Sequence, residues 1–339
     1  MFLKSIRTVL LAAVIFVPAL TGWLVRELAA PAAASPPAKA VFFEVAKGWS
    51  TRSVIAHLKS EGIVRDAPAL QVACRLYFPD ERFKAGEYLF TPPIATKDVL
   101  FRMFGGRIYL EPVTIPEGLT GQEIADLLRP GDPDGAAAFR RAFLDPGLIA
   151  DLDPRAKDLE GYLFPNTYNM PRKAPEAELV GAMVAEFREI FDEGRRRRAA
   201  ALGMSIRDVV TLASLIEEET ALPGERPLVS AVFNNRLKIG MKLDCDPTIV
   251  YALKREGRYT GRLLFRDLKF PSPYNTYLHA GLPPGPISNP GISSLDAALA
   301  PAPEGFLYFV ARGDGSHRFS RTLGEHLDAV KKFRALKNR

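Results

Sequence analysis

The chain has 339 residues, of which 47% are hydrophobic and 25% are charged. This balance excludes an intrinsically disordered chain, and the length allows two or three modest hydrophobic cores. The formal net charge of +6 suits an anionic neighbour such as a membrane surface or a cell-wall polymer.

The amino-terminal segment differs from the rest of the chain because residues 8–25 are apolar or small throughout. Eighteen such residues just span the hydrocarbon layer, which predicts a transmembrane anchor. Lys4 and Arg7 precede the run, so we expect residues 1–7 to stay in the cytoplasm and the remainder to be exported. Small residues at 28–32 leave a cleaved signal peptide open, although signal cores have only roughly 7–15 residues. Export makes nucleic acid an unexpected partner.

An Ala/Pro-rich stretch at 26–40 predicts an extended tether between the anchor and the folded part. The folded part begins near Val41. The chain contains two cysteines, Cys74 and Cys245, which permit one disulfide in an exported protein without requiring it. We expect two free, buried thiols.

An internal repeat follows the tether. Residues 43–58 align without gaps on residues 113–128, and each copy predicts a short strand, a Gly turn, a Ser/Thr cap and an amphipathic helix. Residues 88–104 form a third, degenerate copy, with Thr96 as the helix cap. With the helix and strand that follow it, the first copy gives a unit at 41–110 that resembles a LysM-like module, a family that binds N-acetylated glycans of cell walls. A purely structural spacer remains the alternative, since no aromatic cluster marks a sugar groove.

Residues 111–339 are expected to form a larger, catalytic domain. Apolar residues at three- and four-residue spacing predict helices over 132–143, 176–191, 205–220 and 225–239. The stretch 244–303 is rich in Pro, Gly, Asn and Tyr and is predicted to lack regular structure. A hairpin at 306–320 and a final helix after Thr322 complete the chain. Helices, a hairpin and small strand–helix units together indicate the α+β class.

Three adjacent glutamates end the predicted helix at 205–220. At about 100° per residue, Glu218 falls opposite the apolar stripe, in water. Glu217 shares one edge of the stripe with Val210, and Glu219 lies on the other edge. A carboxylate beside apolar neighbours resists ionising, which makes Glu217 the candidate general acid. The alternative is an ordinary amphipathic helix that ends in solubilising charge.

Several familiar catalytic patterns are absent from the sequence. It contains no Gly-x-Ser-x-Gly, no phosphate loop and no His-Glu-x-x-His, and its four histidines are scattered, so we expect neither a metal nor a cofactor. Acid–base chemistry by carboxylates remains. A tight break at 221–224 would bring Glu225 and Arg226 beside the glutamates, where Arg226 could hold Glu219 or Glu225 ionised.

The loop at 274–277 is the second candidate element of a site. Tyr274, Asn275, Thr276 and Tyr277 combine aromatic faces with amide and hydroxyl groups, as a sugar chain requires for stacking and hydrogen bonding. Taken alone, the same residues could form an ordinary turn.

These segments together resemble the MltG (YceG-like) family of endolytic murein transglycosylases, over nearly the whole chain and in order. The matching segments are 159–165, 213–220, 225–226, 235–237, 246–248, 274–277, 281–287 and 289–291, together with the anchor and the LysM-like unit. One departure is Asn166, where many members have Asp. The resemblance places the catalytic residue at Glu217, the first Glu of the Glu-x-Glu-Thr run. The substrate-binding candidates are Glu219, Thr220, Glu225, Arg226, Tyr274, Asn275, Thr276 and Tyr277.

The resemblance implies cleavage of the β-1,4 bond between N-acetylmuramic acid and N-acetylglucosamine within peptidoglycan strands, without water, to leave a 1,6-anhydro end. It also implies an inner-membrane enzyme that acts outside the cytoplasm beside peptidoglycan synthases, the penicillin-binding proteins, and ends the growth of nascent strands. Two alternatives stay open. Glu219 or Glu225 could serve as the second carboxylate of a hydrolytic muramidase, or the protein could be a non-catalytic peptidoglycan-binding scaffold.

Overall fold

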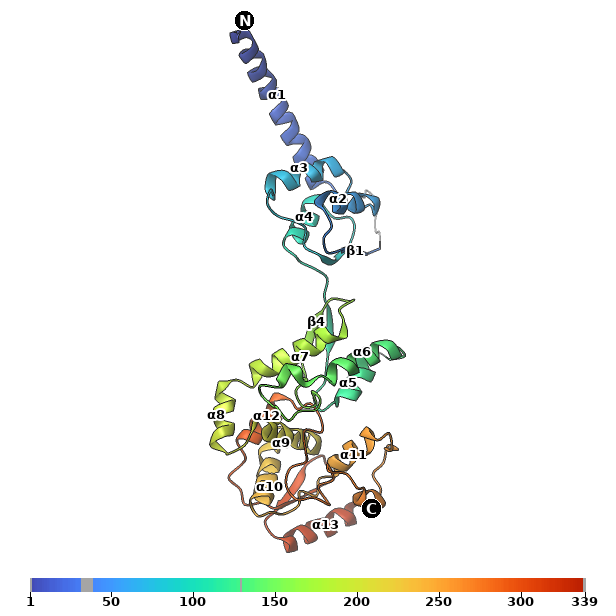
Figure 1. The fold of residues 1–339 in the computed structure, drawn as a ribbon, viewed down its shortest axis with the longest axis vertical. Helices are drawn as coiled ribbons and strands as arrows, with labels where there is room; N and C mark the ends of the chain where they lie inside the picture. Colours follow the sequence, from blue (N-terminus) through green and yellow to red (C-terminus); the bar gives the residue numbers. More distant parts are fainter. Residues whose placement is uncertain (1, 32–38, 129, 338–339) are drawn as a thin grey trace. The chain divides into compact units, whose positions relative to one another are not determined.

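The computed structural model describes residues 2–31, 39–128 and 130–337, with side chains described for residue 14 and from residue 16 to 335 within those ranges (Figure 1). The α-helices are α1 Phe2–Ala29, α2 Thr51–Ser60, α3 Ala67–Tyr77, α4 Thr96–Phe104, α5 Gly121–Leu128, α6 Pro133–Phe143, α7 Glu176–Ile190, α8 Glu193–Ala201, α9 Ile206–Glu219, α10 Arg226–Lys238, α11 Asp246–Arg255, α12 Ile292–Leu299 and α13 Leu323–Lys337. The strands are β1 Val41–Val45, β2 Gly86–Phe90, β3 Glu111–Thr114, β4 Thr167–Met170, β5 Tyr308–Ala311 and β6 His317–Ser320, and two 3-10 helices are η1 Pro146–Ile149 and η2 Phe265–Lys269. Helices with two-stranded sheets confirm the α+β class.

The chain forms two compact units. The first contains Met1–Pro112 and Asn169–Lys173, and the second contains Val113–Tyr168 and Ala174–Arg339. The chain therefore passes between the units more than once, near the paired strands β3 and β4.

Residues 8–25, the expected anchor, lie within α1. Within the described part of the chain, no single helix meets the length and hydropathy test for a membrane span, whereas one pair bent by 92°, α8 with α9, meets it jointly. The expected tether begins later than predicted, because residues 26–29 complete α1 and its last turn packs on the first unit: Leu24 is buried and Glu27 pairs with Arg65 at 2.5 Å. Residues 32–38 of the expected tether lie outside the described residues.

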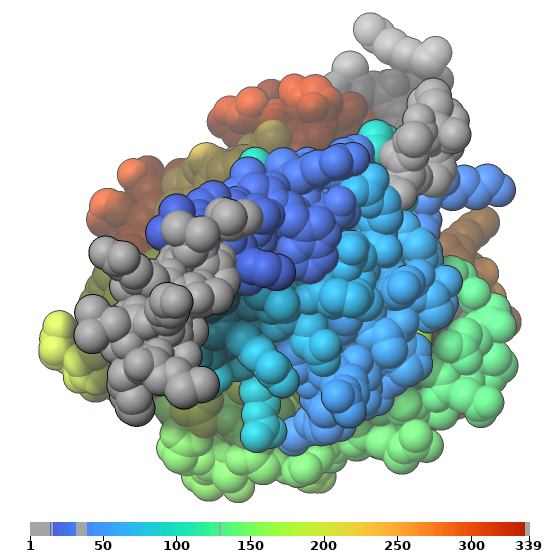
Figure 2. All heavy atoms as spheres, turned by 90° about the horizontal axis from the view of Figure 1, so that it is seen from above, coloured from blue at the N-terminus to red at the C-terminus, as the bar shows by residue number. Residues whose placement is uncertain are grey.

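In the first unit, two antiparallel strands pair with each other, and two helices lie between them in the sequence. Strand β1 pairs with β2 from Val41↔Phe90 to Val45↔Gly86, and α2 and α3 connect them. Helix α1 packs against α3 and α4; in Figure 2 the described blue surface of α1 lies against the lighter blue and cyan of the residues that follow. The degenerate repeat copy forms β2 and α4, but Ala95 rather than Thr96 occupies the cap position, and Thr96 is buried.

Helix α9 lies at the centre of the second unit, in contact with α8, α10, α11 and α12. The predicted cap is present, since Ser205 and Asp208 form a reciprocal capping box. Residues 209–216 are buried without exception, which leaves only the end of the helix accessible. The hairpin of β5 and β6 has the register Tyr308↔Ser320 to Ala311↔His317.

The prediction that 244–303 lacks regular structure is wrong for two segments. Helix α11 begins at the Asp246-Pro247 pair, where proline is favoured in a first turn, and α12 is an eight-residue helix buried against α9. A helix this short is held by tertiary packing rather than by local preference, so its sequence pattern is weak. The two cysteines are free and buried, as expected.

Candidate active site

Glu217 lies at the end of α9 with its carboxylate between two donors. Its side chain is 6% exposed, and Oε1 accepts a hydrogen bond from Nη2 of Arg226 at 2.7 Å. The backbone N–H of Gly291 donates to Oε2 at 3.0 Å. Glu218 is exposed. The helical phase therefore separated the buried carboxylate from the solvated one correctly.

All three glutamates have raised pKa values, so contact geometry rather than pKa distinguishes them. Burial raises the pKa of Glu217, opposed by the Gly291 N–H and the Arg226 guanidinium. Desolvation raises the pKa values of Glu218 and Glu219 to about 7. Because Glu218 is exposed, solvent screens much of this effect. Burial therefore favours the protonated form of Glu217, which is the form that a general acid uses to donate a proton.

Arg226 is the first residue of α10, and its side chain is 7% exposed. The expectation that it pairs with Glu219 or Glu225 is wrong, because the turn between the helices directs it to Glu217. Its Nε atom is buried and has no hydrogen-bond partner among the described residues, and the same holds for the hydroxyl of Ser294 on α12. The Ser294 hydroxyl is close enough to favour the ionised form of Glu217, but the contact lacks good hydrogen-bond geometry.

Glu117 is a second carboxylate at this site, and the sequence reasoning did not select it. Its Oε2 lies 3.6 Å from Nη2 of Arg226, the atom that also binds Glu217, and its side chain is 46% exposed. The carboxylate covers Gly291 so closely that a Cβ added there would lie 1.9 Å from Oε1. A side chain at position 291 would therefore require the Glu117 carboxylate to move. Glu117 belongs to the second repeat copy and precedes its turn glycine, Gly118. That predicted turn was the feature of the sequence that could have indicated a fixed position for the Glu117 side chain.

Glu219 and Glu225 point into a different environment. Residues two positions apart lie on different faces of a helix, and Glu219 lies beside the thiol of Cys245. Glu225 accepts hydrogen bonds from the backbone N–H of His317 at 2.9 Å and contacts its Nδ1 at 2.7 Å. Neither carboxylate is brought to Glu217 as a second reacting group.

Thr220, Asn275 and Thr276 are buried and satisfied within the fold. The Thr220 hydroxyl accepts from the N–H of Leu222 at 3.1 Å, and the Asn275 amide donates to two backbone carbonyls. The Thr276 hydroxyl accepts from the N–H of Cys245 at 3.0 Å. In this conformation these side chains stabilise loops and offer no free group to a substrate.

The two tyrosines of the 274–277 loop differ in their surroundings. The Tyr277 hydroxyl donates to Asp246 at 2.6 Å. The Tyr274 ring lies 5.0 Å from that of Tyr251 and borders a cavity of about 310 Å³. Tyr274 therefore lines an open volume in this structure.

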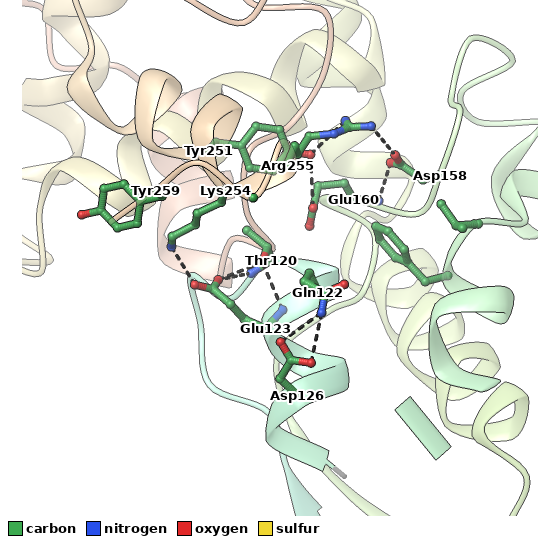
Figure 3. A pocket seen from close by; sticks show the side chains of 13 residues that line it. Thr120, Gln122, Glu123, Asp126, Asp158, Glu160, Tyr251, Lys254, Arg255 and Tyr259 are labelled. Carbon is green, nitrogen blue, oxygen red and sulfur yellow. Dashed lines mark hydrogen bonds and ion pairs between the residues drawn. The ribbon is translucent and has the colours of Figure 1, made fainter. Parts of the chain in front are cut away.

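A larger cavity of about 680 Å³ is lined mainly by residues of α5 and α11 and of the loops beside them (Figure 3). Lys254 and Glu123 line it, and both act electrostatically on Glu218, which places the cavity next to the glutamate run. Glu160 lies at its buried side and accepts hydrogen bonds from the Gly121 N–H at 2.9 Å and from Asn289 at 3.1 Å. Burial raises the pKa of Glu160 to about 8.

No set of three or more His, Cys, Asp or Glu side chains in the described ranges is arranged to hold a metal ion. The chemistry that the described residues offer is proton transfer by Glu217 and charge stabilisation by Arg226 and Glu117.

Comparisons with known proteins show which family the chain belongs to. The endolytic murein transglycosylase of Bacillus subtilis (strain 168) is 32% identical over 315 residues, which cover 88% of this chain and 86% of that protein. The protein of the same name from Streptococcus pneumoniae serotype 2 is 27% identical over 303 residues, 80% of this chain and 54% of that relative, so this chain spans about half of its length. A crystal structure of a yceG-like protein, lmo1499, from Listeria monocytogenes superimposes with a TM-score of 0.57 at 31% identity, over 86% of this chain and 99% of that one. Because a sequence model of the YceG-like family also matches residues 43–332, the chain belongs to that family.

Proposed function

We propose that this protein is an endolytic murein transglycosylase, a lyase that cuts peptidoglycan glycan strands. The observation that carries the proposal is the Glu217 carboxylate, which is buried between the Arg226 guanidinium and the Gly291 N–H. The 32% identical Bacillus subtilis relative carries the name of this activity. The substrate bond is the β-1,4 linkage from N-acetylmuramic acid to N-acetylglucosamine.

The reaction uses Glu217 twice. The protonated carboxyl donates its proton to the leaving glycosidic oxygen as the bond to C1 breaks. The resulting carboxylate takes the proton from the muramyl 6-hydroxyl, whose oxygen closes on C1 to give the 1,6-anhydro end, so that no water is consumed. Arg226 stabilises the Glu217 carboxylate between the two steps. The negative charge of Glu117 stabilises the positive charge that develops on the sugar ring.

A hydrolytic muramidase is the competing outcome, and it would use the same two carboxylates. Hydrolysis normally requires a second carboxylate for water or for a covalent intermediate. Glu117, rather than Glu219 or Glu225, shares Arg226 with Glu217 and could take this role.

Mass spectrometry of digested glycan strands tests the proposal. The transglycosylase yields strands that end in 1,6-anhydromuramic acid. Strands that end in a reducing muramic acid would instead show that the protein is a muramidase. If the wild-type protein forms no product, the remaining interpretation is a non-catalytic peptidoglycan-binding scaffold. Glu217→Gln should lower the rate by about 1,000-fold or more, because the amide can neither donate nor accept the proton. Glu61→Gln, an exposed glutamate of the first unit, is the matched control.

We propose further that residues 8–25 anchor the protein in the inner membrane, with residues 1–7 in the cytoplasm and both units outside it. The apolar run and its basic flank support this. An amino-terminal tag that protease reaches from outside the cell would overturn the orientation. Association with penicillin-binding proteins follows as part of the proposal, since both would act on the same strands.

The first unit is proposed to be a LysM-like glycan-binding module. The order β1, α2, α3, β2 with antiparallel strands supports that resemblance. Affinity of the full-length Glu217→Gln protein for chitooligosaccharides, compared before and after substitution of exposed Phe42 by Ala, would test it.

A further inference from the structure

The larger cavity of the second unit carries charge of both signs. Figure 3 shows Lys254 directed at Glu123 and Arg255 directed at Asp158. Six of its thirteen lining residues are ionisable Asp, Glu, Lys or Arg. Such a lining is unusual for a site that binds only neutral sugars, which rely on aromatic faces and neutral hydrogen-bonding groups.

Arg255 has binding capacity to spare. Its contact with Asp158 is long, 3.8 Å, and its side chain is 46% exposed. The guanidinium lies 5.6 Å from the ring centroids of both Tyr251 and Tyr274, and its Nη1 donates long hydrogen bonds of 3.3 and 3.4 Å to their hydroxyls, which hold it in place without neutralising it. Arg255 also lines the neighbouring cavity of about 310 Å³, so it stands between the two volumes. A planar guanidinium in this setting suits a carboxylate.

Lys254 and Glu123 form the other end of the charged lining. Their contact is short, 2.6 Å, yet both side chains keep about a third of their surface exposed. Glu123 is fixed by the N–H and hydroxyl of Thr120 at 2.9 and 2.8 Å, so it stays in position whatever Lys254 contacts. The lining therefore presents two cations, Lys254 and Arg255, among four carboxylic residues, Glu123, Asp126, Asp158 and Glu160, so that a ligand with both carboxylates and an amine finds partners for each.

Peptidoglycan carries its charge on the stem peptides and not on the sugars. The lactyl carboxyl of muramic acid is consumed in an amide bond, whereas the attached peptide has free carboxylates and often a free amine. We propose that the cavity lined by Lys254, Arg255 and Glu123 binds the stem peptide of a muramic acid residue beside the cleaved bond, so that the enzyme reads peptide as well as glycan. This inference rests on the proposed function.

The test compares two substrates with the full-length protein. One is glycan strands that carry stem peptides, and the other is the same strands stripped of peptide by an amidase, with the freed lactyl carboxyls converted to neutral primary amides. Arg255→Met removes the charge and keeps the apolar stem against the two tyrosines. It should raise KM for peptide-bearing strands by about threefold to tenfold and leave KM for stripped strands unchanged, since a partly exposed ionic contact contributes little more than this.

Controls separate charge from structure. Arg255→Lys should restore most of the affinity, and Lys254→Met should have the same substrate-dependent effect as Arg255→Met. Arg258→Met is the matched control, because Arg258 follows the same helix, is 61% exposed on its side chain and does not line the cavity. Equal losses on both substrates would overturn the proposal in favour of a sugar subsite, and no loss on either would overturn it as well.

A binding measurement keeps this inference distinct from the proposed function. If the wild-type protein cuts neither substrate, the proposed function fails. Calorimetry with a synthetic stem tetrapeptide that contains diaminopimelate then tests peptide binding in the cavity independently of cleavage. Binding that Arg255→Met weakens and Arg258→Met does not would support the peptide site, and absence of binding would overturn it.

Discussion

The two full copies of the repeat, residues 43–58 and 113–128, build the same local structure in different surroundings. Each turns at a glycine with positive φ, +90° at Gly48 and +82° at Gly118. A Cβ added to Gly48 would meet nothing within 4 Å, whereas one added to Gly118 would lie 3.2 Å from Oε1 of Glu218. The same turn is open in the first unit and forms part of the active site in the second.

The helices of the two copies are capped in the same way. Ser50 accepts from the N–H of Ser53, and Thr120 accepts from the N–H of Glu123. The functional difference lies one residue before the glycine, where the first copy has Lys47 and the second has Glu117. The two copies thus share a backbone conformation, and they differ in the side chain before the glycine, which in the second copy lies 3.6 Å from Arg226.

Among exchanges between the two repeat copies, the largest expected effect comes from converting the second copy to the first at this position. Glu117→Lys removes the carboxylate that faces Arg226 and places a cation beside the developing positive charge. We expect kcat to fall by about 100-fold, measured as the rate of anhydro-end formation. The reciprocal change in the first copy, Lys47→Glu, should leave the rate unchanged. A Glu117→Lys enzyme as active as Lys47→Glu would show that the two copies do not differ in chemistry.

The second prediction concerns Glu160, whose contact with the Gly121 N–H supports the start of α5 in the second copy. Its pKa is about 8 in the folded protein against an ordinary value of 4.5, so the folded state binds more protons across that window. The free energy of unfolding should therefore fall as pH rises from about 4.5 to about 8, by at most about 1.4 kcal/mol per pH unit.

Glu160→Gln cannot ionise and should flatten this slope, so that the variant gains stability relative to wild type as pH increases. Thermal unfolding between pH 5 and pH 8, followed by circular dichroism, measures the difference. Parallel curves for Glu160→Gln and wild type would contradict the prediction, and Glu61→Gln in the first unit is the control.

The third prediction exchanges the turn glycines. Gly48→Ala and Gly118→Ala place a side chain in the left-handed region, and each should cost about 1–2 kcal/mol in the free energy of unfolding. Only Gly118→Ala also presses on Glu218, so only this variant should lower kcat/KM, by about threefold. Equal activities would mean that Glu218 moves aside without consequence.

The smallest expected effect concerns the caps. Ser50→Ala and Thr120→Ala each remove one cap hydrogen bond and should each cost about 1 kcal/mol, measured by urea unfolding. A much larger loss for Thr120→Ala would show that its contact with Glu123 contributes beyond capping.

Features that depend on local periodicity could be predicted from the sequence. The helical phase of α9 distinguished buried Glu217 from exposed Glu218, because the angular position of a residue around one helix determines whether its side chain faces the core or the solvent. The capping box at Ser205 is equally local. Glu117 and Gly291 could not be predicted in this way, since they reach Glu217 from segments far apart in the sequence.

Contacts that depend on the tertiary fold could not be predicted from residue types. The partner of Arg226 depends on the direction of the turn at 221–224, which residue types alone leave open. Asn275 and Thr276 have the hydrogen-bonding groups that a sugar requires, but the fold uses those groups to satisfy its own backbone. Side-chain chemistry indicates what a residue can bind, and burial determines whether it is free to do so.

The junction of α1 with the first unit has a practical consequence for protein production. Leu24 is buried, and Trp23 and Leu28 pack against the same core, so the end of α1 belongs to the folded unit. A shortened chain that begins at Val41 would leave this apolar surface uncovered and would strand Arg65 without Glu27. Soluble expression should therefore succeed better from a start near Gly22, which retains these contacts while removing most of the apolar run, than from the start of the first strand.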